Sequence, residues 1–299
     1  MKSKILLIVL GLCLGLILVE VFLRLVGFGY YSVYRIPEDA AADYRIFCIG
    51  ESTTWGVGAS NPILKGYPRQ LEEMLREKFP HKNIQCFFDE TIGQNTSEIL
   101  EKMPTYIKKH QPNLMIFMVG ANNWWNLDKS NILLFSKNKF ISETYFKILV
   151  FLDRFRVWKL FKWIAYSLGL KKERWNYGWP SEWKVDEMGK IIRNRYDWSI
   201  FMKIAEYDIM EMMKICQLNN IKAIICSYPG EGGDLYYVHK SIAQKFRVPF
   251  VDNFKLFMSL PRREEYFAKD VPYGHPNDEG YRLVAENIFK CILENKLIE

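Results

Sequence analysis

The chain has 299 residues, of which 49% are hydrophobic and 25% are charged, and its formal net charge is +7. This composition argues against a disordered chain and allows one large α/β domain with a sizeable core. The positive charge is spread along the sequence without a long block of like charges, so nucleic acid is not an expected partner. The six cysteines show no CxxC or CxH spacing, and we expect no metal site.

The first element is an apolar run over residues 5–23, "ILLIVLGLCLGLILVEVFL", which carries a single charge. At 1.5 Å per residue, about 19 helical residues span roughly 28 Å, close to the hydrocarbon thickness of a bilayer. A cleaved signal peptide has a shorter apolar core followed closely by a small-residue site. We therefore predict an uncleaved transmembrane signal anchor over 1–28 and a linker over 29–43. Lys2 and Lys4 favour a cytoplasmic N-terminus, which places the remaining chain outside the cytoplasmic membrane, in the periplasm or at the cell surface.

From residue 44 onward, strand patterns alternate with helix patterns. Short apolar runs bounded by turn residues predict five strands, within "YRIFCIG", "NIQCFFDE", "NLMIFMVG", "NIKAIICSYPG" and "VPFVDN". Helices are expected between them and at the end of the chain, and Ser97 is the expected cap of the second one. This alternation predicts an α/β fold, a three-layer αβα sandwich around a five-stranded parallel flavodoxin-like sheet, over 44–299. Cys48 and Cys86 fall in strands expected to be neighbours, and a bridge between them stays open.

One stretch, 124–197, is longer than this sandwich needs. It contains "TYFKILVFLDRFRVWKLFKWIAYSLGLKK", which is aromatic, apolar and basic. At about 100° per residue the charges of 151–165 spread around much of a helical wheel, which does not indicate a clean amphipathic helix. We expect a helical insert that forms a cap over the site, and the alternative is a membrane-leaning subdomain.

Polar loops follow the first three predicted strands, where ligands bind in a parallel sheet. Ser52 lies in "GESTTWG" directly after the first strand and is the candidate nucleophile. A serine needs a base within hydrogen-bonding reach and, in most cases, an acid that orients the base. Of the four histidines, His275 in the loop before the last helix is placed to reach this edge, and Asp270 precedes it by five residues.

A serine nucleophile also needs donors aimed at the oxyanion that develops during attack. The side-chain amide of Asn122, after the third strand, is one candidate. Backbone N–H groups of Ser52 and of the turn at Gly93 and Gln94 are the others.

These residues lie in four blocks, "GESTTWG", "GQNTS", "GANN" and "HPNDEGY", which appear in the order of the four blocks of the SGNH (GDSL-type) hydrolase family. The chain resembles this family over about 44–128 and 196–299. The resemblance implies that Ser52 is the nucleophile and His275 the general base. It also implies an oxyanion hole made by the N–H of Ser52, a backbone N–H of the second block and Asn122.

The sequence departs from the family pattern at three places. Glu51 stands where the family often has Asp. Gln94 stands where the family has a glycine, and Gly93 comes one residue early. The acid commonly lies three residues before the histidine, a position occupied here by Pro272, so the nearest carboxylate is Asp270. Asp270 then completes a triad, or the enzyme works as a Ser–His dyad in which a backbone carbonyl orients the histidine.

The expected function is that of an extracytoplasmic, membrane-anchored serine esterase. It would hydrolyse O-acyl esters, acetyl esters foremost, on envelope glycans or lipids through an acyl-enzyme at Ser52, without a cofactor. The expected partners are the acylated substrate and, through the N-terminal helix, the membrane. Two alternatives are an O-acyltransferase with the same residues and a catalytically silent module that binds glycan or phosphate.

Overall fold

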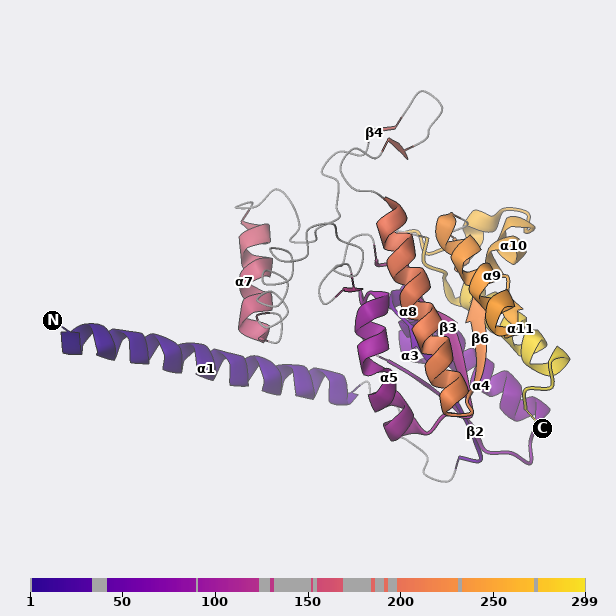
Figure 1. Ribbon diagram of the computed structural model, residues 1–299, viewed down its shortest axis with the longest axis horizontal. Helices are drawn as coiled ribbons and strands as arrows, with labels where there is room; N and C mark the ends of the chain where they lie inside the picture. Colours follow the sequence, from indigo (N-terminus) through magenta and orange to yellow (C-terminus); the bar gives the residue numbers. More distant parts are fainter. Residues whose placement is uncertain are drawn as a thin grey trace. The chain divides into compact units, whose positions relative to one another are not determined.

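A computed structural model provides the fold (Figure 1). It describes residues 2–33, 42–89, 91–123, 130–131, 152, 155–168, 184–185, 191–192, 198–230, 233–271 and 274–298. The chain divides into two compact units. One comprises Met1–Pro37 and Ser136–Asn194, and the other comprises Glu38–Phe135 and Arg195–Glu299. Each unit is described by itself.

The second unit is built on a five-stranded parallel sheet with strand order β2-β1-β3-β6-β7. Its strands are β1 (Tyr44–Gly50), β2 (Ile84–Phe88), β3 (Leu114–Met118), β6 (Lys222–Cys226) and β7 (Phe250–Val251). The predicted flavodoxin-like order is thereby confirmed. In the register of β1 and β3, Gly50 lies beside Met118, so the loops that follow these two strands start at the same level of the sheet.

Helices cover both faces of this sheet. They are α2 (Ser52–Trp55), α3 (Pro62–Lys65), α4 (Tyr67–Lys78), α5 (Thr96–His110), α8 (Trp198–Leu218), α9 (Asp234–Phe246), α10 (Asn253–Met258), the 3₁₀ turn η2 (Arg263–Tyr266) and α11 (Asp278–Glu294). Right-handed crossovers place α4 on one face and α5, α8 and α9 on the other. The packing agrees, because α4 contacts α11 while α5 contacts α8 and α8 contacts α9.

The strands are buried on both sides, as expected for a parallel sheet between two helical layers. Cys48, Cys86 and Cys226 are buried within them with free thiols. Cys48 lies opposite Phe88 rather than Cys86 in the register of β1 and β2. Burial raises the pKa of the Cys86 and Cys226 thiols, so both stay protonated and act as small apolar side chains.

The start of α5 differs from the sequence-based expectation. Asn95 caps the helix: its side chain accepts from the N–H of Glu98 at 2.9 Å, and the Glu98 carboxylate accepts from the N–H of Asn95 at 3.3 Å. Predicting Ser97 as the cap was wrong. The reciprocal capping box makes Asn95 the cap, so the helix begins at Thr96 and Ser97 already lies in its first turn. Ser97 instead donates its hydroxyl to Asp208 of α8 at 2.6 Å.

Among the described residues of the first unit there are two longer helices. In α1 (Lys2–Val33) the 22-residue segment Leu6–Gly27 is long and apolar enough to cross a membrane. The other helix is α7 (Arg156–Ser167), and β4 (Lys184–Val185) pairs with β5 (Ile191–Ile192) in an antiparallel ribbon. Most of 124–197 lies outside the described residues. Whether this stretch forms a cap over the site therefore stays a prediction.

Candidate active site

Ser52 and His275 meet at the carboxyl edge of the sheet. β1 ends at Gly50, and Ser52 is the first residue of α2. A side chain at Gly50 would clash with Thr54 and with the Met118 carbonyl, which explains a glycine at this close approach. His275 lies 223 residues away in sequence, yet its Nε2 is 2.8 Å from the Ser52 Oγ. The predicted nucleophile and base are therefore within hydrogen-bonding distance.

The loop that carries His275 is fixed by its backbone. The N–H of Ala268 donates to the carbonyl of His275 at 2.9 Å, and Phe267 forms a β-bridge with Pro276. Gly58 packs against this loop with φ of +100°, and a Cβ there would lie 2.6 Å from the Pro276 carbonyl oxygen. The turn after Ser52 and the histidine loop thus fit together only while residue 58 has no side chain.

Side chains at the start of α11 join it to the same turn. Asp278 accepts from the N–H and the hydroxyl of Ser60, at 2.7 and 2.6 Å. The hydroxyl of Tyr281 donates to the carbonyl of Val57 at 2.7 Å. Asn277 caps α11 by accepting from the N–H of Gly280 at 3.0 Å. These contacts hold the element that follows His275 against the element that carries Ser52.

Glu51 connects the nucleophile loop to the loop after β3. Its carboxylate is buried, with 1% of the residue exposed. One oxygen accepts from the N–H of Gly120 at 2.7 Å, and the other accepts from the hydroxyl of Tyr228. Sequence reasoning set Glu51 aside and missed Tyr228. The signal for the pair was a carboxylate and a tyrosine, each within two residues of the end of an apolar strand, at one sheet edge.

His239 supports this connection without taking part in the site. Its Nε2 donates to the carbonyl of Val119 at 2.8 Å, and its ring stacks beside Tyr228. Burial lowers the pKa of His239 to about 4, although the bond to Val119 acts the other way. The ring is therefore neutral at physiological pH, which suits a structural role in the core.

Asn122 is 8% exposed and lies in the turn that follows β3, where its amide nitrogen is shielded from solvent. The neighbouring Asn123 joins this turn to the start of α5: its Oδ1 accepts from the N–H of Thr96 at 2.9 Å, and its Nδ2 donates to the Thr96 hydroxyl at 2.7 Å. The second and third polar loops are thereby linked by a side chain that sequence reasoning did not single out.

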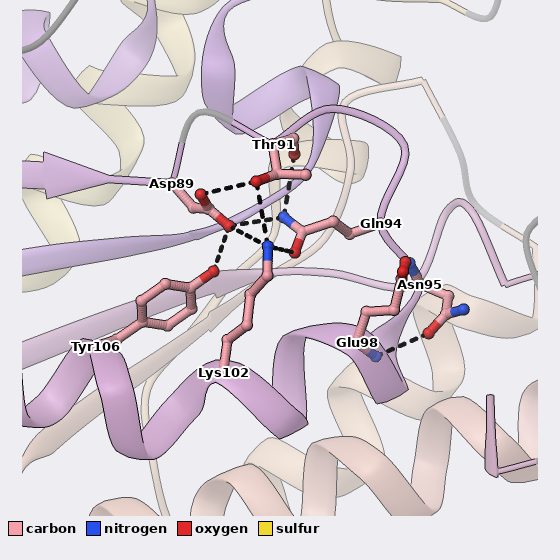
Figure 2. A network of polar contacts seen from close by, with 7 residues as sticks. All are labelled: Asp89, Thr91, Gln94, Asn95, Glu98, Lys102 and Tyr106. Atoms are coloured by element: carbon pink, nitrogen blue, oxygen red, sulfur yellow. Dashed lines mark hydrogen bonds and ion pairs between the residues drawn. The ribbon is translucent and has the colours of Figure 1, made fainter. Parts of the chain in front are cut away.

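A polar network holds the loop between β2 and α5 (Figure 2). Lys102 donates to the Asp89 carboxylate at 3.1 Å, to the Thr91 hydroxyl at 3.1 Å and to the Gln94 Oε1 at 2.5 Å. The Gln94 Nε2 donates to Asp89 at 2.8 Å, and the Tyr106 hydroxyl also donates to Asp89. Burial raises the pKa of Asp89, but the Lys102 ammonium and these hydrogen bonds outweigh it and hold the pKa below its ordinary value. The carboxylate therefore stays ionised at the centre of the network.

This network accounts for the unusual placement of glycine in the second block. Gly93 has φ of +79°, a backbone conformation that favours glycine. Gln94 is 2% exposed, and its side chain is directed toward Asp89 and Lys102 (Figure 2). Glycine is thus required at 93, while residue 94 carries a side chain that anchors the loop. That the backbone N–H of Gly93 or Gln94 faces an oxyanion stays a prediction.

Asp270 differs from the other predicted site residues. It lies exposed on the loop before His275, and among the described residues no hydrogen bond joins its carboxylate to the histidine. The intervening residues 272–273 lie outside the described part of the chain. The role of Asp270 as the orienting acid therefore stays a prediction.

No family profile matches the sequence, and no curated protein matches it. Among solved structures, a lipase/acylhydrolase from Enterococcus faecalis superposes with a TM-score of 0.50 at 12% identity, covering 84% of this chain and 96% of its own. The chain shares its fold with this hydrolase. At such low identity the similarity concerns the fold alone.

Two other solved structures are similar at a slightly lower level. A GDSL-like lipase from Parabacteroides merdae has a TM-score of 0.49 at 13% identity, covering 88% of this chain and 100% of its own. An acetyl xylan esterase from Geobacillus stearothermophilus has a TM-score of 0.49 at 14% identity, covering 84% and 95%. The chemistry of the present site has to be argued from its own residues.

Proposed function

We propose that this protein is a serine ester hydrolase in which Ser52 is the nucleophile and His275 the general base. The observation that carries the proposal is the 2.8 Å separation between the Ser52 Oγ and the His275 Nε2. A serine hydroxyl is a weak nucleophile until a base at this distance takes its proton. The imidazole acts as that base when its own proton is on Nδ1 and Nε2 has a free lone pair.

The reaction proceeds in two steps. In the first, the Ser52 Oγ attacks the acyl carbon while His275 takes the hydroxyl proton, and the tetrahedral intermediate collapses as His275 returns that proton to the departing alcohol. In the second, His275 takes a proton from the water that attacks the acyl carbon, and it returns this proton to the Ser52 Oγ as the carboxylic acid is released. This Ser–His chemistry needs no cofactor.

The oxyanion hole in this proposal consists of the Ser52 N–H, a backbone N–H of Gly93 or Gln94, and the Asn122 side-chain amide. Preorganised donors of this kind act best when their own positions are fixed. Two contacts support that requirement. Glu51 links the first polar loop to the third through Gly120, and Asn123 links the third loop to α5 through Thr96.

Orientation of His275 has two candidate sources. Asp270 is the proposed acid, and the alternative is a dyad in which a backbone carbonyl holds the imidazole. Exposure of Asp270 weakens its electrostatic effect on a neighbour, because water screens exposed charges.

The proposed substrates are O-acyl esters, acetyl esters foremost, on envelope glycans or lipids. The Leu6–Gly27 segment supports membrane anchoring by its length and apolar character. With Lys2 and Lys4 on the cytoplasmic side, the catalytic domain would lie outside the cytoplasmic membrane. Transfer of the acyl group to a sugar hydroxyl instead of water would use the same residues.

Turnover of p-nitrophenyl esters tests the proposal. We expect the detergent-solubilised full chain to hydrolyse p-nitrophenyl acetate and to prefer it over the octanoate, if the acyl pocket accepts acetyl groups. Addition of a glycan acceptor separates hydrolysis from transfer, because only transfer yields an acylated glycan. A folded protein that turns over neither ester would contradict an esterase.

The network of Figure 2 predicts an effect on catalysis at a distance from the nucleophile. Lys102→Met keeps most of the side-chain length but removes the donor that joins Asp89, Thr91 and Gln94. We expect kcat to fall by about 10- to 100-fold with KM nearly unchanged, since losing one oxyanion donor outright costs on the order of 10²–10³. Steady-state kinetics measure this, with Lys108→Met, a lysine of the same helix outside the network, as the control. If Lys102→Met changed the melting temperature but left kcat unchanged, the network would stabilise the fold without contributing to catalysis.

A further inference from the structure

Helix α7 has an exposed apolar face. Phe161, Ile164 and Leu168 are 56%, 40% and 67% exposed, and the N–H of Leu168 donates to the carbonyl of Ile164 at 2.9 Å, which continues the helical bonding past the last turn. At about 100° per residue these three positions fall within an arc of about 60°. Lys159 and Lys162 fall on the opposite side of the wheel.

This segregation corrects the interpretation of the sequence. The range 151–165 included charged residues that precede the helix. With those residues counted, charged and apolar positions appeared on the same side of the helical wheel. The helix begins at Arg156. From that residue onward, the basic positions and the exposed apolar positions lie on different faces, which is the pattern of an interfacial helix.

The start of α7 is attached to the candidate membrane span. The N–H of Val157 donates to the Glu20 carboxylate at 2.9 Å, and the Arg156 guanidinium donates to the carbonyl of Leu23 at 2.8 Å. A Cβ at Gly27 would lie 1.6 Å from the Arg156 Nη1, so the guanidinium occupies the space that this glycine leaves. Both partners of these contacts belong to the same compact unit.

These contacts fix the level of α7 relative to α1. From Glu20 to Gly27 the helix rises roughly 10 Å at 1.5 Å per residue. Interfacial helices bury their apolar face about 5–10 Å into the boundary between headgroups and acyl chains, so a helix attached to this stretch of α1 would lie within reach of that boundary. The contacts lie in the last turns of the Leu6–Gly27 segment, where a span of this length reaches the membrane surface.

We infer that α7 lies in the interface of the bilayer that α1 spans, with the exposed face of Phe161, Ile164 and Leu168 among the acyl chains. The inference rests on the membrane anchor of the proposed function. Lipid is the partner of this face, because α7 belongs to the same compact unit as the candidate membrane span α1. It replaces the expected cap over the site with a second attachment to the membrane.

Depth-dependent quenching tests the inference on the full chain. Single cysteines replace Phe161, Ile164 or Leu168, and Lys159 or Lys162 as matched controls, in a Cys13→Ser background. The other five cysteines are buried and remain. Each variant is labelled with a polarity-sensitive fluorophore and reconstituted into vesicles of zwitterionic and anionic phospholipid that contain nitroxide-labelled acyl chains. We expect blue-shifted emission and several-fold stronger quenching at the apolar positions than at the two lysine positions.

Equal, weak quenching at all five positions would overturn the inference, and so would equal, strong quenching, which would indicate a buried or spanning helix. A label at Leu16, in α1, reports separately on the anchor. Strong quenching at Leu16 with none on α7 would reject the α7 interface alone. No quenching at Leu16 would reject the anchor as well, while ester hydrolysis, measured on the same samples, reports on the catalytic proposal.

Discussion

Replacing Ser52 with alanine is expected to lower kcat for p-nitrophenyl acetate by on the order of 10⁴ or more, and His275→Ala by a similar factor. Either change removes the pair that generates the nucleophile, whose reacting atoms are 2.8 Å apart. Because the two side chains act as a unit, the double variant should be no slower than the worse single variant. Steady-state kinetics of the three variants measure both expectations.

Matched controls separate loss of chemistry from loss of structure. Ser259→Ala and His81→Ala change exposed residues of the same types elsewhere in the domain and should leave kcat unchanged. Circular dichroism and the melting temperature verify that each variant is folded. Multiplicative losses in the double variant would mean that Ser52 and His275 act independently, contrary to the proposed pair.

Asn122 is expected to have the second largest effect. Asn122→Ala should lower kcat by on the order of 10²–10³ while KM changes little, because an oxyanion donor acts on the transition state more than on the bound ester. Asn122→Asp is the stricter test. It keeps the shape of the side chain but replaces the donor with a carboxylate that repels developing negative charge, so its loss should be at least as large.

The control for Asn122 is Asn219→Ala, at an exposed asparagine just after α8 whose side-chain amide donates to the carbonyl of Ile215 in the last turn of that helix. This variant should retain the kcat of the unmodified protein. If Asn122→Ala raised KM without lowering kcat, Asn122 would bind substrate and not stabilise an oxyanion.

Much of the fold could be predicted from local patterns. The positions of the strands can be read from short apolar runs in the sequence, and the general rule of right-handed crossovers limits how such strands are arranged. Ser52 and His275 could be named because they lie in loops at one sheet edge and because the four blocks resemble a known family. Their direct contact joins positions 223 residues apart, which local patterns alone do not reveal.

Side-chain pairings that connect the polar loops could not be predicted. The bonds from Glu51 to Tyr228 and from Gln94 to Lys102 depend on the positions of separate elements. The cap of α5 was misplaced because three consecutive residues, Asn95, Thr96 and Ser97, all carry side chains that can cap a helix, and the capping box with Glu98 selects Asn95. The amphipathic face of α7 was missed because the range 151–165 included charged residues that precede the start of the helix at Arg156.

Covalent labelling of Ser52 tests the central claim most directly. A fluorophosphonate reacts with a serine whose hydroxyl is activated by a neighbouring base, so the folded full chain should gain the mass of one adduct. Peptide mapping should place it on Ser52, and both Ser52→Ala and His275→Ala should remain unlabelled. An adduct on another serine, or a folded protein that never reacts while a known serine esterase in the same tube does, would contradict the assignment of Ser52 as the nucleophile.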